Sequence, residues 1–415
     1  MTSSYLLSIL TFTLFWHGKG YALRMRSTGL LLELTVLAMV VSRSGHAQTW
    51  TVTGSPSNQW YAVACSADGS RVVAATGGQF VNGQVYISND SGTNWTLTSA
   101  PLQRWTSLAS SADGTKLIGA AYDRAIYTSA DSGTTWISNN VANLPSGTWM
   151  SVSSSADGST LFAVRYANYV LYSSSNSGAL WVPRTTTLAD LFSVAVSADG
   201  TIAVASDNNG HVATSTNAGL TWSTNTTLVG FSVVRVAASA DGHRLVAVPM
   251  GATVFASTNQ GATWASNSLP ANSSWLAAGC SADGSRLTVI AQKGLIYSST
   301  NSALTLISNS APGLIWQSVA SSADGNCVFA APSNGSIWVR RTTPAPVLAL
   351  TTSAPGPVLS WVLPSAKFVV QRSASLQTPA WTDLLNAPLL NLTNLEYQLL
   401  LPPGNDSGYY RLRND

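Results

Sequence analysis

Short alternations of apolar and polar residues, separated by turn residues, run through most of the chain. Between residues 105 and 140 the stretches "WTSLASS", "KLIGAAY", "AIYTSA" and "TWISNN" each fit a strand of a few residues. "ADGT", "DRA" and "DSGT" separate them, and Asp-Gly is a strong hairpin signal. No stretch of the sequence has helical periodicity. The pattern predicts a unit of four short antiparallel strands.

This unit repeats along the chain with a period near 42 residues. A Ser-Ala-Asp-Gly motif recurs seven times, and the steps between its aspartates are 45, 44, 42, 42, 42 and 41 residues. Four strands in a repeat of this length are typical of a β-propeller blade, whereas solenoid coils of this length usually contain helices. We predict an all-β fold with a seven-bladed β-propeller at residues 48–340. The motif aspartates are Asp68, Asp113, Asp157, Asp199, Asp241, Asp283 and Asp324.

The last repeat lacks a fourth strand of its own. "QTWTVTGS", at residues 48–55, matches the fourth-strand sequence "NWTLTSA" at residues 94–100. We expect the strand around Trp50 to complete the seventh blade, because this closes the ring and removes an exposed sheet edge.

A second motif, Ser-x-Asp-x-Gly-x-x-Trp, lies between the third and fourth strands of most repeats. Five repeats carry a regular copy of this motif. A sixth copy is degenerate, with Ala303 and Leu306 in place of glycine and tryptophan. Serine and Asp or Asn accept bonds from turn amides, and glycine takes a positive φ. Three copies carry asparagine, which keeps the acceptor but would disable a catalytic acid, so we interpret the motif as scaffolding. Its acidic or amide residues are Asp90, Asp131, Asn176, Asn217 and Asn259.

This motif resembles the Asp-box, also called the bacterial neuraminidase repeat. With "WTSLASSADG" and its equivalents, residues 48 to about 340 look most like the photosystem II stability/assembly factor-like propellers and the wider sialidase-like and sortilin-like group. The resemblance implies the propeller fold, but the group contains hydrolases, receptors and assembly factors. Sialidases need a glutamate to activate their tyrosine nucleophile. The only glutamates here, Glu33 and Glu396, lie outside the propeller, which excludes conventional sialidase chemistry.

Composition and charge exclude further classes of function. Only 9% of the 415 residues are charged and the net charge is +3 without a basic cluster, so no nucleic-acid partner is expected. Neither His211 nor His243 has metal-ligand spacing, and no cofactor motif is present, so we expect no metal and no cofactor. A hydrolase other than a sialidase remains an alternative; it would use two of Asp123, Asp190 and Asp207 as acid and base.

Residues 1–47 have the features of an export segment. Arg24 and Arg26 precede an apolar stretch at residues 30–41, and small residues at Gly45 and Ala47 favour cleavage after Ala47. Met25 is an alternative initiator. No apolar run reaches the roughly 18–20 residues of a membrane-spanning helix, so we expect no integral membrane segment in the mature chain. We predict a secreted, periplasmic or cell-surface protein, a monomer, and no disulfide among the three cysteines.

The two faces of the predicted ring differ in sequence variation. Both repeated turns share one face, which we call the turn face. The linkers between blades and the loops between second and third strands share the other, the variable face, where propellers usually carry recognition. Five blades begin their inner strand with tryptophan, which is interpreted either as interblade packing or as an aromatic platform for a ligand. These residues are Trp60, Trp105, Trp149, Trp275 and Trp316.

Arg235 is the main exception within the inner strands. The other blades carry Ala or Ser in its slot, so we place this cation at the mouth of the central channel. Neighbouring variable-face residues complete a candidate site for an anionic or hydroxyl-rich ligand. They are Arg104, Trp105, Tyr122, Arg124, Arg165, Tyr166, Tyr169, His211 and Lys293. The predicted function is a non-catalytic binding or assembly protein with a protein or glycan partner; a purely structural surface protein is a further alternative.

The repeat stops after "RRTTPAP". Residues 341–346 read as a linker, and residues 347–415 contain alternating strands that resemble the small fibronectin-type or immunoglobulin-like sandwich at the end of many exported bacterial proteins. That resemblance implies a spacer, an adhesion module or an export signal, and the sequence does not choose among them.

Overall fold

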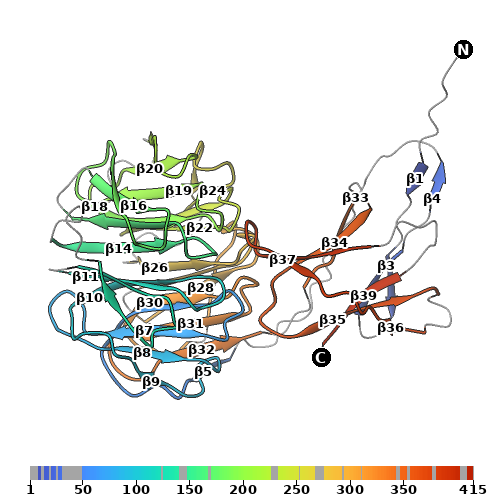
Figure 1. Ribbon diagram of the computed structural model, residues 1–415, viewed down its shortest axis with the longest axis horizontal. Coiled ribbons are helices and arrows are strands. Elements are labelled where there is room, and N and C mark those ends of the chain that lie inside the picture. The colour runs from blue at the N-terminus through green and yellow to red at the C-terminus, as the bar shows by residue number, and fades with distance from the viewer. Residues whose placement is uncertain are drawn as a thin grey trace, which may run out of the picture.

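The computed structural model contains two β-domains joined side by side (Figure 1). It describes residues 8–10, 14–17, 20–24, 27–29, 49–122, 125–139, 147–166, 170–225, 232–251, 253–266, 275–291, 294–309, 311–342, 346–352, 356–375, 380–401 and 409–414. The predicted all-β class, the seven-bladed propeller and the C-terminal sandwich are confirmed.

Each blade is a four-stranded antiparallel sheet whose strands follow sequence order from the channel outward. Blade 1 comprises β6 (Trp60–Cys65), β7 (Val72–Thr76), β8 (Val85–Ser88) and β9 (Thr96–Leu97); blade 2 comprises β10 (Trp105–Ser110), β11 (Leu117–Ala121), β12 (Ile126–Ser129) and β13 (Ile137–Ser138). Blade 3 comprises β14 (Trp149–Ser154), β15 (Leu161–Arg165), β16 (Val170–Ser174) and β17 (Val182–Thr185); blade 4 comprises β18 (Leu191–Val196), β19 (Ala203–Asp207), β20 (Val212–Ser215) and β21 (Ser223–Asn225). Blade 5 comprises β22 (Ser232–Ala238), β23 (Leu245–Met250), β24 (Phe255–Ser257) and β25 (Ala265–Ser266); blade 6 comprises β26 (Trp275–Cys280), β27 (Leu287–Ala291), β28 (Ile296–Ser299) and β29 (Ile307–Ser308).

Blade 7 is completed by the N-terminal strand, as predicted. Its own strands are β30 (Trp316–Ser321), β31 (Cys327–Pro332) and β32 (Trp338–Arg341), and β5 (Trp50–Val52) pairs antiparallel with β32. The Ile337 carbonyl accepts bonds from both the amide and the hydroxyl of Thr53, at 2.9 Å each. The first and last parts of the propeller are therefore joined by a sheet ladder.

A ring of backbone hydrogen bonds closes the propeller around its channel. The alanine of each Ser-Ala-Asp-Gly turn donates its N–H to the carbonyl of the equivalent alanine in the next blade, at 2.6–2.8 Å. The last of these bonds runs from Ala323 to Ala67, so the circuit returns to its first member. The members are Ala67, Ala112, Ala156, Ala198, Ala240, Ala282 and Ala323.

The C-terminal module is a sandwich of two sheets. One contains β33 (Ala349–Thr352), β34 (Pro357–Val362), β38 (Glu396–Leu400) and β37 (Leu389–Asn391) in that order. The other contains β2 (Leu14–His17), β3 (Gly20–Arg24), β39 (Tyr409–Asn414), β35 (Phe368–Ser373) and β36 (Thr382–Asp383). Leu359, Trp361, Val370 and Tyr410 form the core between the sheets.

The N-terminal segment therefore meets the end of the chain. Within the predicted export segment, β3 pairs with β39, and β1 (Ser8–Leu10) pairs with β4 (Ser27–Gly29). The apolar stretch at 30–41 and the predicted cleavage position after Ala47 lie outside the described residues. No helix in the described part of the chain is long and apolar enough to cross a membrane.

The C-terminal module also covers the alanine ring. Leu363 is 6% exposed and belongs to the same apolar cluster as six of the ring alanines, with Leu395 and Tyr397 packed beside it. Ser365 donates two further bonds, from its amide and its hydroxyl, to Asp324 Oδ2 at 2.7 and 2.8 Å. The module therefore rests on the turn face of the propeller.

We expect Leu363→Asp to detach the module from the propeller, because a carboxylate buried against the ring alanines would lack a partner. Limited proteolysis of the full chain should then cut between residues 341 and 349 faster than in wild type, while the propeller keeps its melting temperature. Equal cleavage rates in the two proteins would contradict this docking.

The three cysteines are free thiols. Burial raises the pKa of the Cys280 thiol, and separately that of Cys327, to about 12 in each case. Both groups are therefore protonated at neutral pH and serve as small apolar side chains.

Candidate binding face and the scaffold behind it

The serine and aspartate side chains of the Ser-Ala-Asp-Gly turns bond within their own turns. In blade 2, Ser111 Oγ donates to Asp113 Oδ1 at 2.6 Å and accepts the Lys116 amide at 3.0 Å. The same carboxylate oxygen accepts the Thr115 amide at 3.0 Å, and Gly114 takes a φ of 72°. These bonds rigidify the corner where the inner strand reverses. The corresponding serine-to-aspartate bond recurs at Asp68, Asp157, Asp199, Asp241, Asp283 and Asp324.

The turns between third and fourth strands are equally self-contained. Ser129 Oγ donates to Asp131 Oδ1 and accepts the Gly133 amide, each at 2.8 Å. Thr135 donates its amide and hydroxyl to the Asp131 carboxylate at 2.8 and 2.7 Å, and Trp136 Nε1 donates to the Gly133 carbonyl. The same bonds occur at Asp90 and, with an amide oxygen as acceptor, at Asn176, Asn217 and Asn259. Asn301 of the degenerate copy also makes them, which the sequence reasoning missed.

A substitution series at Asp131 tests this scaffold role. Asp131→Ala should lower the free energy of unfolding by about 1 kcal/mol, since the turn amides lose their acceptor. Asp131→Asn should cost less, because blades 3 to 5 use asparagine in the same turn.

The bonds from the Thr135 side chain and amide lower the pKa of the Asp131 carboxyl. A lowered native pKa contributes stability above the ordinary value near 4, and this is lost as the pH falls through the native pKa. Urea unfolding at pH 7 and at pH 3 should therefore show the gap between wild type and Asp131→Asn shrinking in acid; a gap that widens would contradict the account.

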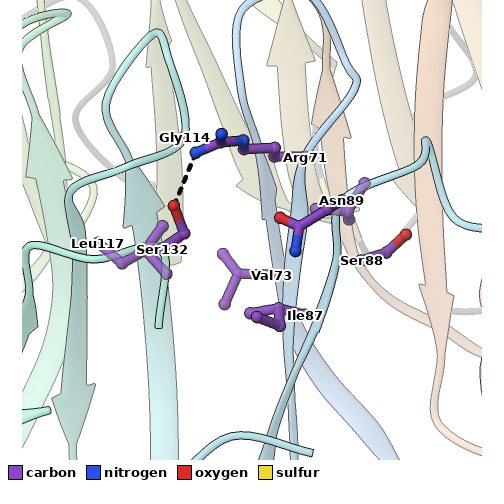
Figure 2. Close-up of a pocket in the computed structure, with 9 residues that line it drawn as sticks. Arg71, Val73, Ile87, Ser88, Asn89, Gly114, Leu117 and Ser132 are labelled. Carbon is purple, nitrogen blue, oxygen red and sulfur yellow. Dashed lines mark hydrogen bonds between the residues drawn. The ribbon is translucent and has the colours of Figure 1, made fainter. Parts of the chain in front are cut away.

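Cations of the turn face brace neighbouring blades. Arg71 of blade 1 donates from Nη1 to Ser132 Oγ of blade 2 at 2.7 Å, above a small pocket lined by Val73, Ile87 and Leu117 (Figure 2). Lys116 reaches the blade 3 turn at Ser177 in the same way, at 3.2 Å. Arg286 reaches Asn326 of blade 7 at 2.6 Å, and Arg244 bonds to Ser302 of blade 6. The turn-face pocket therefore lies at a contact between two blades, and its cation, Arg71, is already hydrogen-bonded to Ser132.

The loops and linkers of the variable face do lie together, as their backbone bonds show. The amide of Tyr122 donates to the Arg104 carbonyl at 2.8 Å, and that of Tyr166 to the Thr148 carbonyl at 2.9 Å. The Asn208 amide likewise donates to Asp190. In blades 2, 3 and 4 the second-to-third-strand loop is thus tied to the linker that precedes its own inner strand.

The small residues in the Arg235 slot have a function that the sequence did not reveal. The hydroxyl of Ser107 accepts the Val152 amide of the next blade at 3.2 Å, and Ser193 accepts the Val236 amide at 3.3 Å. Ser151 and Ser318 make the equivalent bonds to Val194 and Val63. In blades 2, 3, 4 and 7 the residue in this slot thus bonds to the next blade, and Arg235 cannot make this bond in blade 5.

The Arg235 guanidinium instead lies over the ring of Phe192, 4.2 Å from its centroid. Tyr61 occupies the position in blade 1 that Phe192 occupies in blade 4, directly after the first residue of the inner strand. Burial lowers the pKa of Arg235, although an arginine stays charged at neutral pH. Among the described residues no carboxylate lies within ion-pair distance of it. The arrangement is a cation on an aromatic face, with no paired carboxylate in the part of the chain that the structure describes.

Only some of the other predicted site residues are described and exposed enough to contact a ligand. Arg104 and Arg165 are half-buried on the variable face, and Tyr166 is exposed. Tyr122 is half-buried and packs against the core between blades 3 and 4. Arg124, Tyr169 and Lys293 lie outside the described residues.

Trp105 is not a ligand platform. Its side chain is fully buried and packs against Tyr127 and Trp136, with ring centroids 5.2 and 5.9 Å away. The first tryptophans of the other inner strands are also buried, so the packing interpretation holds for this ring of residues and the platform interpretation is wrong. The residues that the sequence reasoning missed, Tyr61 and Phe192, each directly follow the buried residue at the start of an inner strand.

The aspartate pair of the hydrolase alternative is not supported by the geometry. Asp207 is fully buried; its carboxylate accepts the amides of Asn209 and His211 at 2.9 and 2.8 Å. Its second oxygen contacts His211 Nδ1 at 2.7 Å. An acid that caps its own loop in this way does not face a substrate. Asp123 lies outside the described residues, and the described ones contain no cluster of three metal-ligating side chains.

Solved propellers share this fold. YCF48 from Cyanidioschyzon merolae matches at 12% identity and a TM-score of 0.56, over 70% of this chain and 98% of that one. A structure of YCF48 bound to D1 peptide matches at 14% identity and 0.54, over 72% and 99%. The GH74 enzyme of Niastella koreensis matches at 19% and 0.52, over 71% of this chain and 44% of the enzyme. No family model and no curated protein matches the sequence. At these identities the matches show the fold alone.

Proposed function

We propose that this chain is an exported, non-catalytic binding or assembly propeller that recognises a protein partner through its variable face. The observation that carries the proposal is Arg235 of β22, whose guanidinium lies on the Phe192 ring with no carboxylate within ion-pair distance among the described residues. A partner carboxylate at this position would form a charge-assisted bond to a partly desolvated cation, which is stronger than one at an exposed cation.

Two further features support a binding role. The aspartates and most cations of the turn face are engaged in turn and interblade bonds, and the C-terminal module covers the alanine ring there. YCF48, a propeller of the same fold, has been solved with a bound peptide, so the fold is able to hold a protein segment. Export is proposed from the sequence of residues 1–47, which supports a secreted, periplasmic or cell-surface location.

The test uses the full chain and a library of random peptides with free carboxyl termini. Peptides selected on wild type should lose about tenfold or more in affinity when Arg235 is replaced by Gln, and part of it should return with Arg235→Lys. Lys367→Gln is the matched control, because Lys367 is an exposed cation of the C-terminal module. Selected peptides that bind Arg235→Gln as tightly as wild type would overturn the proposal.

A further inference from the structure

The second-to-third-strand loop of blade 1, residues 77–84, differs from its counterparts in the described blades. It has two consecutive glycines in the left-handed region, Gly77 at φ 92° and Gly78 at φ 119°. Gly83 exchanges both backbone hydrogen bonds with Gln103 of the next linker, at 2.7 and 3.2 Å. A Cβ on Gly83 would lie 1.8 Å from the Thr76 carbonyl oxygen, so the close approach requires glycine. The loop is therefore held in one conformation.

This loop presents apolar side chains to solvent. Phe80 is 78% exposed and Val81 51%, while Leu102, on the paired linker, is 60% exposed. Exposed residues of this size, clustered on a rigid loop, are a feature of protein interaction sites, since binding them costs little conformational entropy. Nothing in residues 77–84 or 99–103 is charged.

Tyr61 relates the position of this loop to that of Arg235. Gly78 passes so close to the Tyr61 ring that a Cβ there would lie 2.4 Å from Cδ2. Tyr61 holds in β6 the position that Phe192 holds in β18, directly after the first residue of the inner strand, so it lies at the same level of the ring as the aromatic side chain under Arg235. The variable face therefore carries an uncharged apolar loop next to a tyrosine, followed by an aromatic-backed cation.

We propose that residues 77–84, with Leu102, form the apolar half of the binding surface. They seat an apolar side chain of an extended protein segment whose carboxylate pairs with Arg235. This inference rests on the proposed function and names the chemistry of its partner. A protein segment fits because one chain supplies both an apolar group for Phe80, Val81 and Leu102 and an anion for Arg235.

The test applies two loop variants to the peptides selected on wild type. Those peptides should be enriched in large apolar residues together with a carboxylate. Phe80→Ser should weaken their binding about tenfold or more, and Phe80→Leu should weaken it less. Leu304→Ser is the matched control, because Leu304 is 72% exposed but lies on the turn face.

The outcomes separate the two proposals. Peptides that need Arg235 but bind Phe80→Ser as well as wild type would overturn the apolar half and leave the proposed function intact. Peptides indifferent to Arg235→Gln would overturn the proposed function itself. Selection of no peptide, with binding to a glycan array that Phe80→Ser abolishes, would overturn the protein-segment assignment.

Discussion

We expect deletion of residues 48–56 to abolish cooperative unfolding of the propeller. The segment supplies β5, whose loss exposes the edge of β32 and leaves blade 7 with three strands. It also removes Trp50, which is 5% exposed and packs against Trp316 at 6.2 Å and Arg340 at 5.8 Å. A ring that is not closed loses the contacts of its last blade, and the bared edge invites aggregation.

Calorimetry of the full chain and the deletion variant checks this result. Trp50→Ala is a milder companion that keeps the strand, and its cost should be about 3–5 kcal/mol, as for other buried aromatic truncations. An unchanged melting transition in the deletion variant would show that β5 does not close the ring.

The second large effect is a difference in stability between alanine variants of two aromatic residues, Trp105 of blade 2 and Phe80 of blade 1. Trp105→Ala should lower the free energy of unfolding by about 3–5 kcal/mol, because the indole is fully buried between blades. Phe80→Ala should change it by no more than about 0.5 kcal/mol, since that side chain is 78% exposed. Peptide binding should respond in the opposite order, with Phe80→Ala weakening it and correctly folded Trp105→Phe leaving it unchanged.

Urea unfolding of both alanine variants, beside Trp105→Phe, makes the comparison. The indole Nε1 of Trp105 is buried without a hydrogen-bond partner among the described residues, so phenylalanine loses packing alone and should cost less than alanine. A Trp105→Ala variant as stable as wild type would contradict the packing role.

The fold was predictable because the repeat is local. Each Ser-Ala-Asp-Gly corner forms from residues within five positions of one another, as the Ser111, Asp113 and Lys116 bonds show. Seven such corners set the number of blades, and the match of "QTWTVTGS" to a fourth strand was enough to place β5. Asparagine in three of the outer turns correctly indicated structural turns, since its amide oxygen makes the same bonds as the carboxylate.

The features that were not predictable depend on contacts between distant residues. The packing of Leu363 on the alanine ring joins positions in different domains, and nothing in the local pattern of the tail indicates it. The serine hydroxyls in the Arg235 slot join four of the blades to the next blade, so their sequence signal is only a preference for serine in one slot. Asp207 was a candidate acid because it is one of the few propeller aspartates outside the repeated turns. Its burial against His211 depends on the three-dimensional structure. Phe80 had a usable signal, a large apolar residue between glycines in an unusually long loop.

Hydrogen exchange on the complex tests the central claim most directly. The full chain is compared free and bound to a peptide selected from the random library, and amide protection is mapped along the sequence. The account predicts added protection at residues 77–84 and 191–193 on the variable face, and none at residues 88–95 and 129–136 in the turns of the opposite face. Protection confined to those turns would show that the repeated corners bind the partner, and it would contradict the division between scaffold and recognition face.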